Sequence, residues 1–180
     1  MKGILFNLVE QIVTEDHGAD MWDDLLDDAG LFGAYTSIGS YDDAEMMAIL
    51  DAASQRLDVP VPEVERHLGR RALPLFLERY PELRGDHTTS RGLIMTLNSF
   101  IHPQVRILHP GADVPDFDVA EIESDSIEMT YRSGRRLCFF AEGLLLGAGD
   151  EYGENIAVSQ STCMHDGADH CVLQVMWESP

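Results

Sequence analysis

Three residues in the second half of the chain combine two hydroxyl groups with a guanidinium. They are Tyr131, Ser133 and Arg135, and they occupy alternate positions. On extended backbone alternate side chains project to the same side, so we expect the three to converge. Two neutral donors and one bidentate cation suit a carboxylate or a phosphate, and a following helix N-terminus would add free N–H groups. The pattern is short, and it also fits a structural role in which Ser133 caps the helix and Arg135 lies in solvent.

A second candidate is His102, which lies in an apolar stretch between Ile101 and Pro103. A histidine in such a helix is more often a core or rim residue than a metal ligand. Neutral imidazole is, however, the usual protein ligand of haem iron. Pro103 also lacks an N–H group, so the carbonyl of Ser99 loses its helical partner. His102 is therefore a candidate iron ligand on one wall of a pocket.

The cysteines form a third candidate site. Cys163 and Cys171 bracket a polar turn that contains His165 and His170, and Cys138 precedes them. Three thiolates and one imidazole are a common structural zinc set. Three buried free thiols, or thiolates that sense oxidation, are the alternatives. An odd number of cysteines does not build a disulfide framework, so we expect a reducing cytoplasm.

Helices must position these residues in the first half of the chain, where apolar residues recur at three- and four-residue spacing. We expect helices over about 4–17, 21–29, 44–57, 62–80 and 88–109. Pro74 should kink or interrupt the fourth helix, and Pro110 and Gly111 should stop the fifth.

Strands follow in the second half. Ile127, Met129 and Tyr131 alternate with polar residues, as in a half-buried strand. Residues 134–154 return to a helical pattern, and two closing strands are expected near 156–163 and 171–178. The predicted fold is α+β, with an N-terminal helical part followed by an antiparallel four-stranded sheet with helices. We expect a single domain over 1–180, with a helical part at 1–62 and a helix-plus-sheet part at 63–180.

Composition limits the partners. The chain has 180 residues and a formal net charge of -20. Such an acidic surface repels nucleic acid and anionic lipid, so we expect neither as a partner. No apolar run approaches the roughly 18 residues of a membrane span. The apolar start is broken by Asn7 and Glu10, which argues against a signal peptide.

The order of these features resembles the H-NOX family, the haem nitric oxide/oxygen-binding domain related to the sensor part of soluble guanylate cyclase. The resemblance covers essentially the whole chain. It rests on the start MKGILFN, Gly18-x-x-x-Trp22, His102, His109-Pro110-Gly111, Pro115, Tyr131-x-Ser133-x-Arg135 and FFAEGLLLGA.

The resemblance implies a role for each of these residues. His102 would be the proximal ligand of a b-type haem buried between the helical part and the sheet. Tyr131, Ser133 and Arg135 would bind the haem propionates, and Pro115 would press on the porphyrin and distort it. The implied distal-pocket positions are Leu5, Val9, Pro74, Phe140 and Leu144.

The segments RRLCF and CMHDGADHC resemble the zinc turn of a proteobacterial subgroup of stand-alone, NO-sensing H-NOX proteins. That resemblance implies zinc on Cys138, Cys163 and Cys171 with His165 or His170. The subgroup has a histidine three residues before Cys163, where this chain has Gln160, and this leaves the fourth ligand open.

The implied function is sensing rather than catalysis. Members that hold oxygen use a distal tyrosine where this chain has Phe140, which cannot donate a hydrogen bond. We therefore expect a nitric oxide sensor, which also binds carbon monoxide, in which NO at ferrous haem releases His102. The signal would pass to a separate histidine kinase or cyclic-dinucleotide enzyme. The alternative is a haem-free, small-molecule or redox-sensing zinc module.

Overall fold

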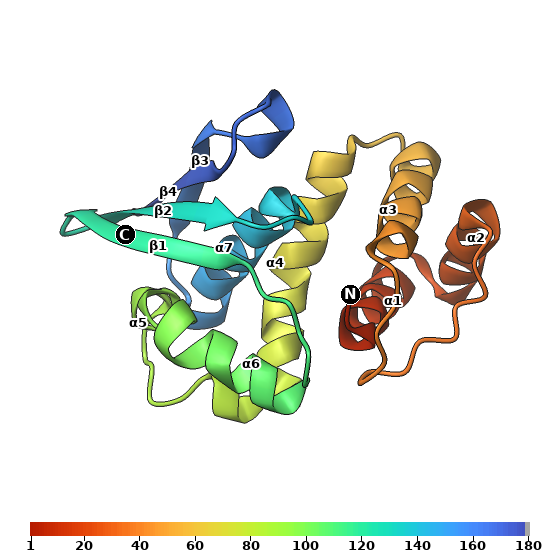
Figure 1. The fold of residues 1–180 in the computed structure, drawn as a ribbon, viewed down its shortest axis with the longest axis horizontal. Helices are drawn as coiled ribbons and strands as arrows, with labels where there is room; N and C mark the ends of the chain where they lie inside the picture. Colours follow the sequence, from red (N-terminus) through yellow and green to blue (C-terminus); the bar gives the residue numbers. More distant parts are fainter. Residues whose placement is uncertain (179–180) are drawn as a thin grey trace.

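A long central helix separates three N-terminal helices from a β-sheet in the computed structural model, which describes residues 1–178 (Figure 1). The first four helices are α1 (Gly3–His17), α2 (Ala19–Ala29), α3 (Asp43–Leu57) and the central α4 (Val61–Arg79). They confirm the four helices expected from apolar spacing. Within residues 1–178, no helix is both long enough and apolar enough to cross a membrane.

Local signals explain where these helices begin and end. Gly30 ends α2 in the left-handed conformation, with φ of 67°, which a residue without Cβ adopts at little cost. Asp42 begins α3, and its carboxylate accepts a hydrogen bond from the backbone N–H of Ala44 at 2.9 Å. The end of α2 and the start of α3 therefore have clear local causes.

The central helix continues through Pro74, so the predicted interruption does not occur. Pro74 leaves the carbonyl of Arg70 without its helical N–H partner. That carbonyl lies against α7 (Cys138–Tyr152), where a Cβ added to Gly147 would be 2.5 Å from it. A Cβ on Gly143 would likewise be 2.2 Å from the carbonyl of Arg66. The close backbone packing of α7 therefore supports α4 in the turns before Pro74.

The helix predicted over 88–109 is instead three shorter pieces, which corrects that expectation. They are α5 (Ser90–Met95), the π-helical turn η2 (Leu97–Ile101) and α6 (His102–Leu108). The backbone N–H of His102 donates to the carbonyl of Leu97, five residues earlier, as in a π-turn. Pro103 follows directly and cannot supply the next hydrogen bond, so the break falls at the candidate ligand.

The sheet contains four antiparallel strands in the order β1-β2-β4-β3. They are β1 (Asp116–Glu123), β2 (Ser126–Arg132), β3 (Ile156–Thr162) and β4 (Cys171–Trp177). Alternate residues of β2 and β4 are buried, among them Met129, Tyr131 and Leu173. Two short 3-10 turns, η1 (Pro81–Leu83) and η3 (Met164–Asp166), complete the order. The predicted α+β class with an antiparallel four-stranded sheet is confirmed.

Two apolar cores result from this arrangement. The first is built by α1, α2, α3 and the beginning of α4, whereas the second lies among the sheet, α5 and α7. The central helix serves both, because Val64 and Leu68 belong to the first core and Leu77 belongs to the second. Residues from both sides face a cavity between the cores.

Candidate functional site

The cavity between the two cores has a volume of about 250 Å³ and is lined mainly by apolar side chains. Leu5 comes from α1, Leu73 and Phe76 from α4, and Phe140 and Leu144 from α7. The polar side chains that line it are Lys2, Ser40, His102, His109, Asp113, Tyr131, Ser133 and Arg135. A small polar set in an apolar cavity is typical of a site for an organic cofactor.

His102 lies on the cavity wall at the start of α6, with 8% of its surface exposed. Its ring stacks on Phe117 with centroids 5.9 Å apart. Burial, and to a lesser extent the positive charge of Arg106, lowers its pKa to about 4, so the imidazole is neutral. Among residues 1–178 it has no hydrogen-bond partner on either ring nitrogen, and it therefore has a lone pair available for a metal.

Tyr131, Ser133 and Arg135 all line the cavity, but strand alternation does not bring them together. Strand β2 ends at Arg132, and the chain then turns. The Ser133 hydroxyl accepts from the backbone N–H of Arg135 at 3.3 Å, whereas the residue before α7 is Leu137. Ser133 therefore shapes the turn and does not cap the helix. Burial raises the pKa of Tyr131 to about 12, so its phenol stays a donor.

Arg135 is held by acidic partners that the sequence patterns did not indicate. Its Nε donates to Asp43 at 2.9 Å, and its Nη1 contacts both the carbonyl and the carboxylate of Asp113. Asp43 also contacts the amino group of Met1 at 2.6 Å. The Arg135 side chain is only 18% exposed, so it does not lie free in solvent.

The remaining expected haem contacts divide into two groups. Pro115, Leu5, Phe140 and Leu144 line the cavity. Val9 is buried in the N-terminal core, and Pro74 lies inside α4; neither is among the residues that line the cavity.

These residues fit a b-type haem by their chemistry. His102 offers one neutral imidazole to iron, and Tyr131, Ser133 and Arg135 offer donors to carboxylates. His109 adds a sign that a polar partner belongs in the cavity, because neither of its buried ring nitrogens has a hydrogen-bond partner within the described part of the chain. Its position seven residues after His102 places it on the same side of the helix, a spacing that the sequence-based prediction did not use.

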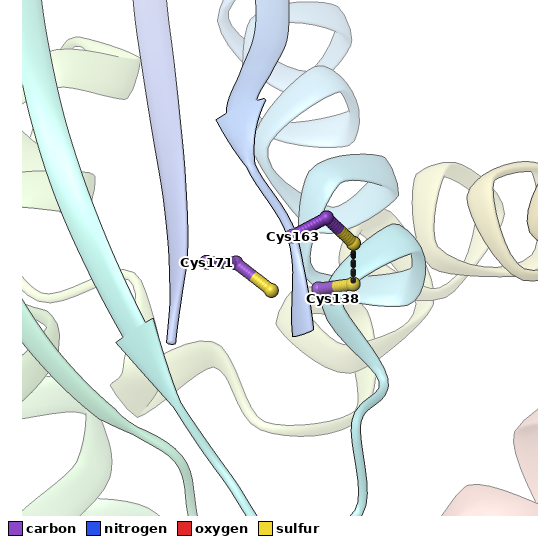
Figure 2. A group of neighbouring side chains, drawn as sticks. All are labelled: Cys138, Cys163 and Cys171. Atoms are coloured by element: carbon purple, nitrogen blue, oxygen red, sulfur yellow. Dashed lines mark hydrogen bonds between the residues drawn. The ribbon is translucent and has the colours of Figure 1, made fainter. Parts of the chain in front are cut away.

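The three cysteines meet beside the N-terminus of α7, as Figure 2 shows. All three are buried free thiols whose sulfur atoms lie within 4.8 Å of one another, with Cys138 and Cys163 3.8 Å apart. Burial raises the pKa of Cys138 and of Cys171. A divalent cation would reverse that effect by stabilising the thiolates.

The two candidate histidines lie outside this sulfur group in the structure. His165 places Nε2 2.8 Å from the carbonyl of Arg136, and its ring stacks on Phe139. The Nδ1 atom of His170 is 2.5 Å from the carboxylate of Asp169. The structure thus brings the three thiols together and leaves both imidazoles with other contacts.

Gln160 is the nearest departure from the expected zinc pattern. It is directly opposite Leu173 in the β3–β4 register, on the face of the sheet that carries Cys171 two residues away. Both atoms of its amide are buried without a hydrogen-bond partner in the described region. Gln160 therefore carries an unsatisfied polar group on the sheet face that also carries Cys171.

Comparisons with known proteins identify the fold. The haem-NO-binding family matches residues 2–160. A crystal structure of an H-NOX protein from S. oneidensis in the Fe(II)NO state is 33% identical, with a TM-score of 0.94, over 99% of this chain and 100% of that one. An NMR structure of a Shewanella oneidensis H-NOX domain in the Fe(II)CO state is 32% identical, with a TM-score of 0.90, over 100% of both chains. An Fe(II) unliganded H-NOX protein from K. algicida is 25% identical, with a TM-score of 0.89, over 100% of this chain and 98% of that one. No curated protein matches the chain.

Proposed function

This chain belongs to the haem-NO-binding (H-NOX) family, and we propose on that basis that it senses nitric oxide through a b-type haem held by His102. Members of the family are haem-based gas sensors and not enzymes. The observation that carries the proposal is the shared cavity, where a buried neutral imidazole faces the same space as Tyr131, Ser133 and Arg135.

Each residue has a distinct task in this proposal. When bound, the haem would supply a ferrous iron to which NO can bind. His102 binds the iron, and Arg135 with its two hydroxyl neighbours orients a carboxylate by charge-assisted hydrogen bonds. Pro115 packs against the macrocycle. The apolar walls, Leu5 and Leu144 among them, exclude water.

The distal side favours NO over oxygen. Bound oxygen is partly anionic and is stabilised by a hydrogen-bond donor, which Phe140 lacks. NO binds ferrous iron strongly without such a donor. Carbon monoxide would also bind, without loss of the histidine.

The signal would leave through His102. If His102 held the iron, we would expect NO binding to release its imidazole. His102 joins the π-turn to α6, where Pro103 removes a helical hydrogen bond, so a shift there costs less than in an intact helix. The receiver would be a histidine kinase or a cyclic-dinucleotide enzyme.

We also propose structural zinc on Cys138, Cys163 and Cys171. The mutual distances of the sulfur atoms support it. The fourth ligand would be His165 or His170 after a side-chain rotation, and either must give up the contact described above.

Absorption spectra of the purified ferrous protein, with and without NO, test the function directly. We expect a haem band in the wild-type protein, and its shift on NO addition. His102→Gly should lose haem or recover it only with free imidazole, whereas His17→Gly, on the exposed end of α1, should behave as wild type. A colourless wild-type protein, or an unchanged ferrous spectrum in His102→Gly, would contradict the proposal.

A further inference from the structure

His109 is a buried imidazole for which the described part of the chain offers no partner. Its exposed fraction is 4%, and both ring nitrogens are buried without a hydrogen bond. The ring meets Tyr80 edge-on, with centroids 5.4 Å apart, and it lines the same cavity as His102. A buried polar group without a hydrogen-bond partner lowers the stability of the folded state. Its presence in a native fold therefore indicates a function, such as binding a ligand that supplies the partner.

The helix places His109 and His102 at different parts of the cavity. The two residues are seven positions apart, close to two full turns, so they project from the same side of α6 and its end. Seven residues of helix rise about 10 Å. If His102 holds the iron at the centre of a planar haem, His109 stands too far along the helix for the iron and faces the edge of the ring.

Positive charge lies beside His109. Burial lowers the pKa of His109, and the nearby charge of Lys2 lowers it further, so the ring is neutral and keeps one N–H donor. Lys2 also lines the cavity. Lys2 reaches the loop 111–115, since its Nζ would lie 3.9 Å from a Cβ added to Gly111, and Asp113 of the same loop contacts Arg135. The loop therefore lies beside both groups of donors.

A haem carries two propionate carboxylates. The single positive charge of Arg135 is not enough to balance both, because Asp43 and Asp113 already pair with this guanidinium. Lys2 and His109 provide an independent cation and an independent donor. We propose that His109, with Lys2 beside it, binds one haem propionate while Tyr131, Ser133 and Arg135 bind the other. This proposal rests on the proposed haem-binding function.

The first test measures haem transfer from the ferric protein to an excess of apomyoglobin. His109→Phe keeps a ring of similar shape but removes the donor, and it should accelerate haem loss about tenfold or more, because a hydrogen bond to a charged group is lost. His109→Gln keeps an N–H donor and should lose haem more slowly than His109→Phe. The matched control is His17→Phe on the exposed end of α1, which should leave the rate unchanged.

The second test repeats the comparison with haem dimethyl ester, whose carboxylates are blocked. We expect the rate ratio between His109→Phe and wild type to fall close to one with the ester. Equal rates with native haem would overturn the proposal, and so would a ratio that persists with the ester, since that would indicate packing. A change of iron coordination in the absorption spectrum of His109→Phe would also overturn it. If the wild-type protein kept no haem, the proposed function would fail as well, whereas retention with equal rates would refute this proposal alone.

Discussion

At the scale of single residues, the proposed function gives Phe140 the role of setting which gas the cavity stabilises. It lines the cavity from the first turn of α7. We expect Phe140→Tyr to create an oxygen complex in the ferrous protein, with oxygen dissociation slowed about tenfold or more by the new donor. Stopped-flow dissociation of oxygen measures this, with Phe139→Tyr, which faces His165, as the control. A stable oxygen complex in the wild-type protein would contradict the role given to Phe140.

Gln160 offers a test of the zinc site. Its side chain lies diagonally across the β3–β4 pair from Cys171, on the same face of the sheet. Gln160→His would place an imidazole where the amide is now unsatisfied, and it should raise zinc affinity about tenfold or more, because neither His165 nor His170 would then have to give up its present contact to complete the four ligands. Competition with a chelator measures the affinity. Ser159→His, on the opposite face of β3, is the control, and equal affinity in both variants would show that a side chain at position 160 does not reach the metal.

Residue types and spacing predicted part of this site. The sequence alone was enough to select His102 and the group Tyr131, Ser133 and Arg135, because their residue types and spacing indicate their chemistry. The partners of Arg135 could not, since Asp43 lies 92 positions away and meets it only through the fold. Val9 was expected in the pocket from the resemblance, but its side chain packs in the N-terminal core. Contacts that depend on helix rotation, such as this one, have no signature in one sequence.

The contact between α4 and α7 dominates at the scale of elements, because glycines allow the two backbones to touch. A Cβ on Gly143 would lie 2.2 Å from the carbonyl of Arg66 and 2.8 Å from the backbone nitrogen of Arg70. We therefore expect Gly143→Ala to lower the free energy of unfolding by about 2 kcal/mol or more, despite the better helix propensity of alanine. Gly134→Ala, where nothing lies within 4 Å of the added Cβ, should change it by less than about 1 kcal/mol. Urea denaturation of both variants measures this, and equal stability would contradict the close contact.

Glu65 lies between the same two helices, α4 and α7, and it should make the stability of the protein depend on pH. It is 3% exposed, and its Oε2 accepts from the backbone N–H of Phe140 at 3.3 Å. Burial raises its pKa from 4.5 to about 7, so the folded state favours the protonated acid. The stability that this proton gives is present below pH 4.5 and is lost as pH rises through 7.

The wild-type protein should therefore lose up to about 3 kcal/mol relative to Glu65→Gln between pH 4.5 and pH 8. Urea denaturation of both proteins across that range isolates the contribution of this one group. A difference that stays constant with pH would show that Glu65 titrates normally in the folded state.

Elements were easier to predict than their interruptions. Apolar spacing located α1 and α3, because one stripe of side chains faces a single core. The stretch 88–109 kept the same spacing, yet its backbone changes to a π-turn at Leu97–Ile101. Thr96 contributes to that change, since its hydroxyl bonds back to the carbonyl of Leu93 at 2.9 Å. Apolar periodicity shows which side of a helix faces the core. It does not show whether the backbone hydrogen bonds follow the α-helical or the π-helical pattern.

The whole molecule consists of two cores that share α4 and face each other across the cavity. A haem that touches both would couple them. We expect the haem-free protein to unfold in two calorimetric transitions, and the haem-loaded protein in one transition at higher temperature. A single transition in the haem-free protein would show that α4 alone makes the cores cooperative.

The same division has a consequence for synthesis on the ribosome. Every buried residue of the first core lies between Met1 and Ala72, so this core can assemble while the rest of the chain is still being made. The second core needs Leu173 and Val175 from the last strand. Tyr131 is paired with Cys171 across β2 and β4, so the side of the cavity that Tyr131 lines takes shape only after β4 has been made. We therefore expect the proposed haem to be captured only after the second core has formed.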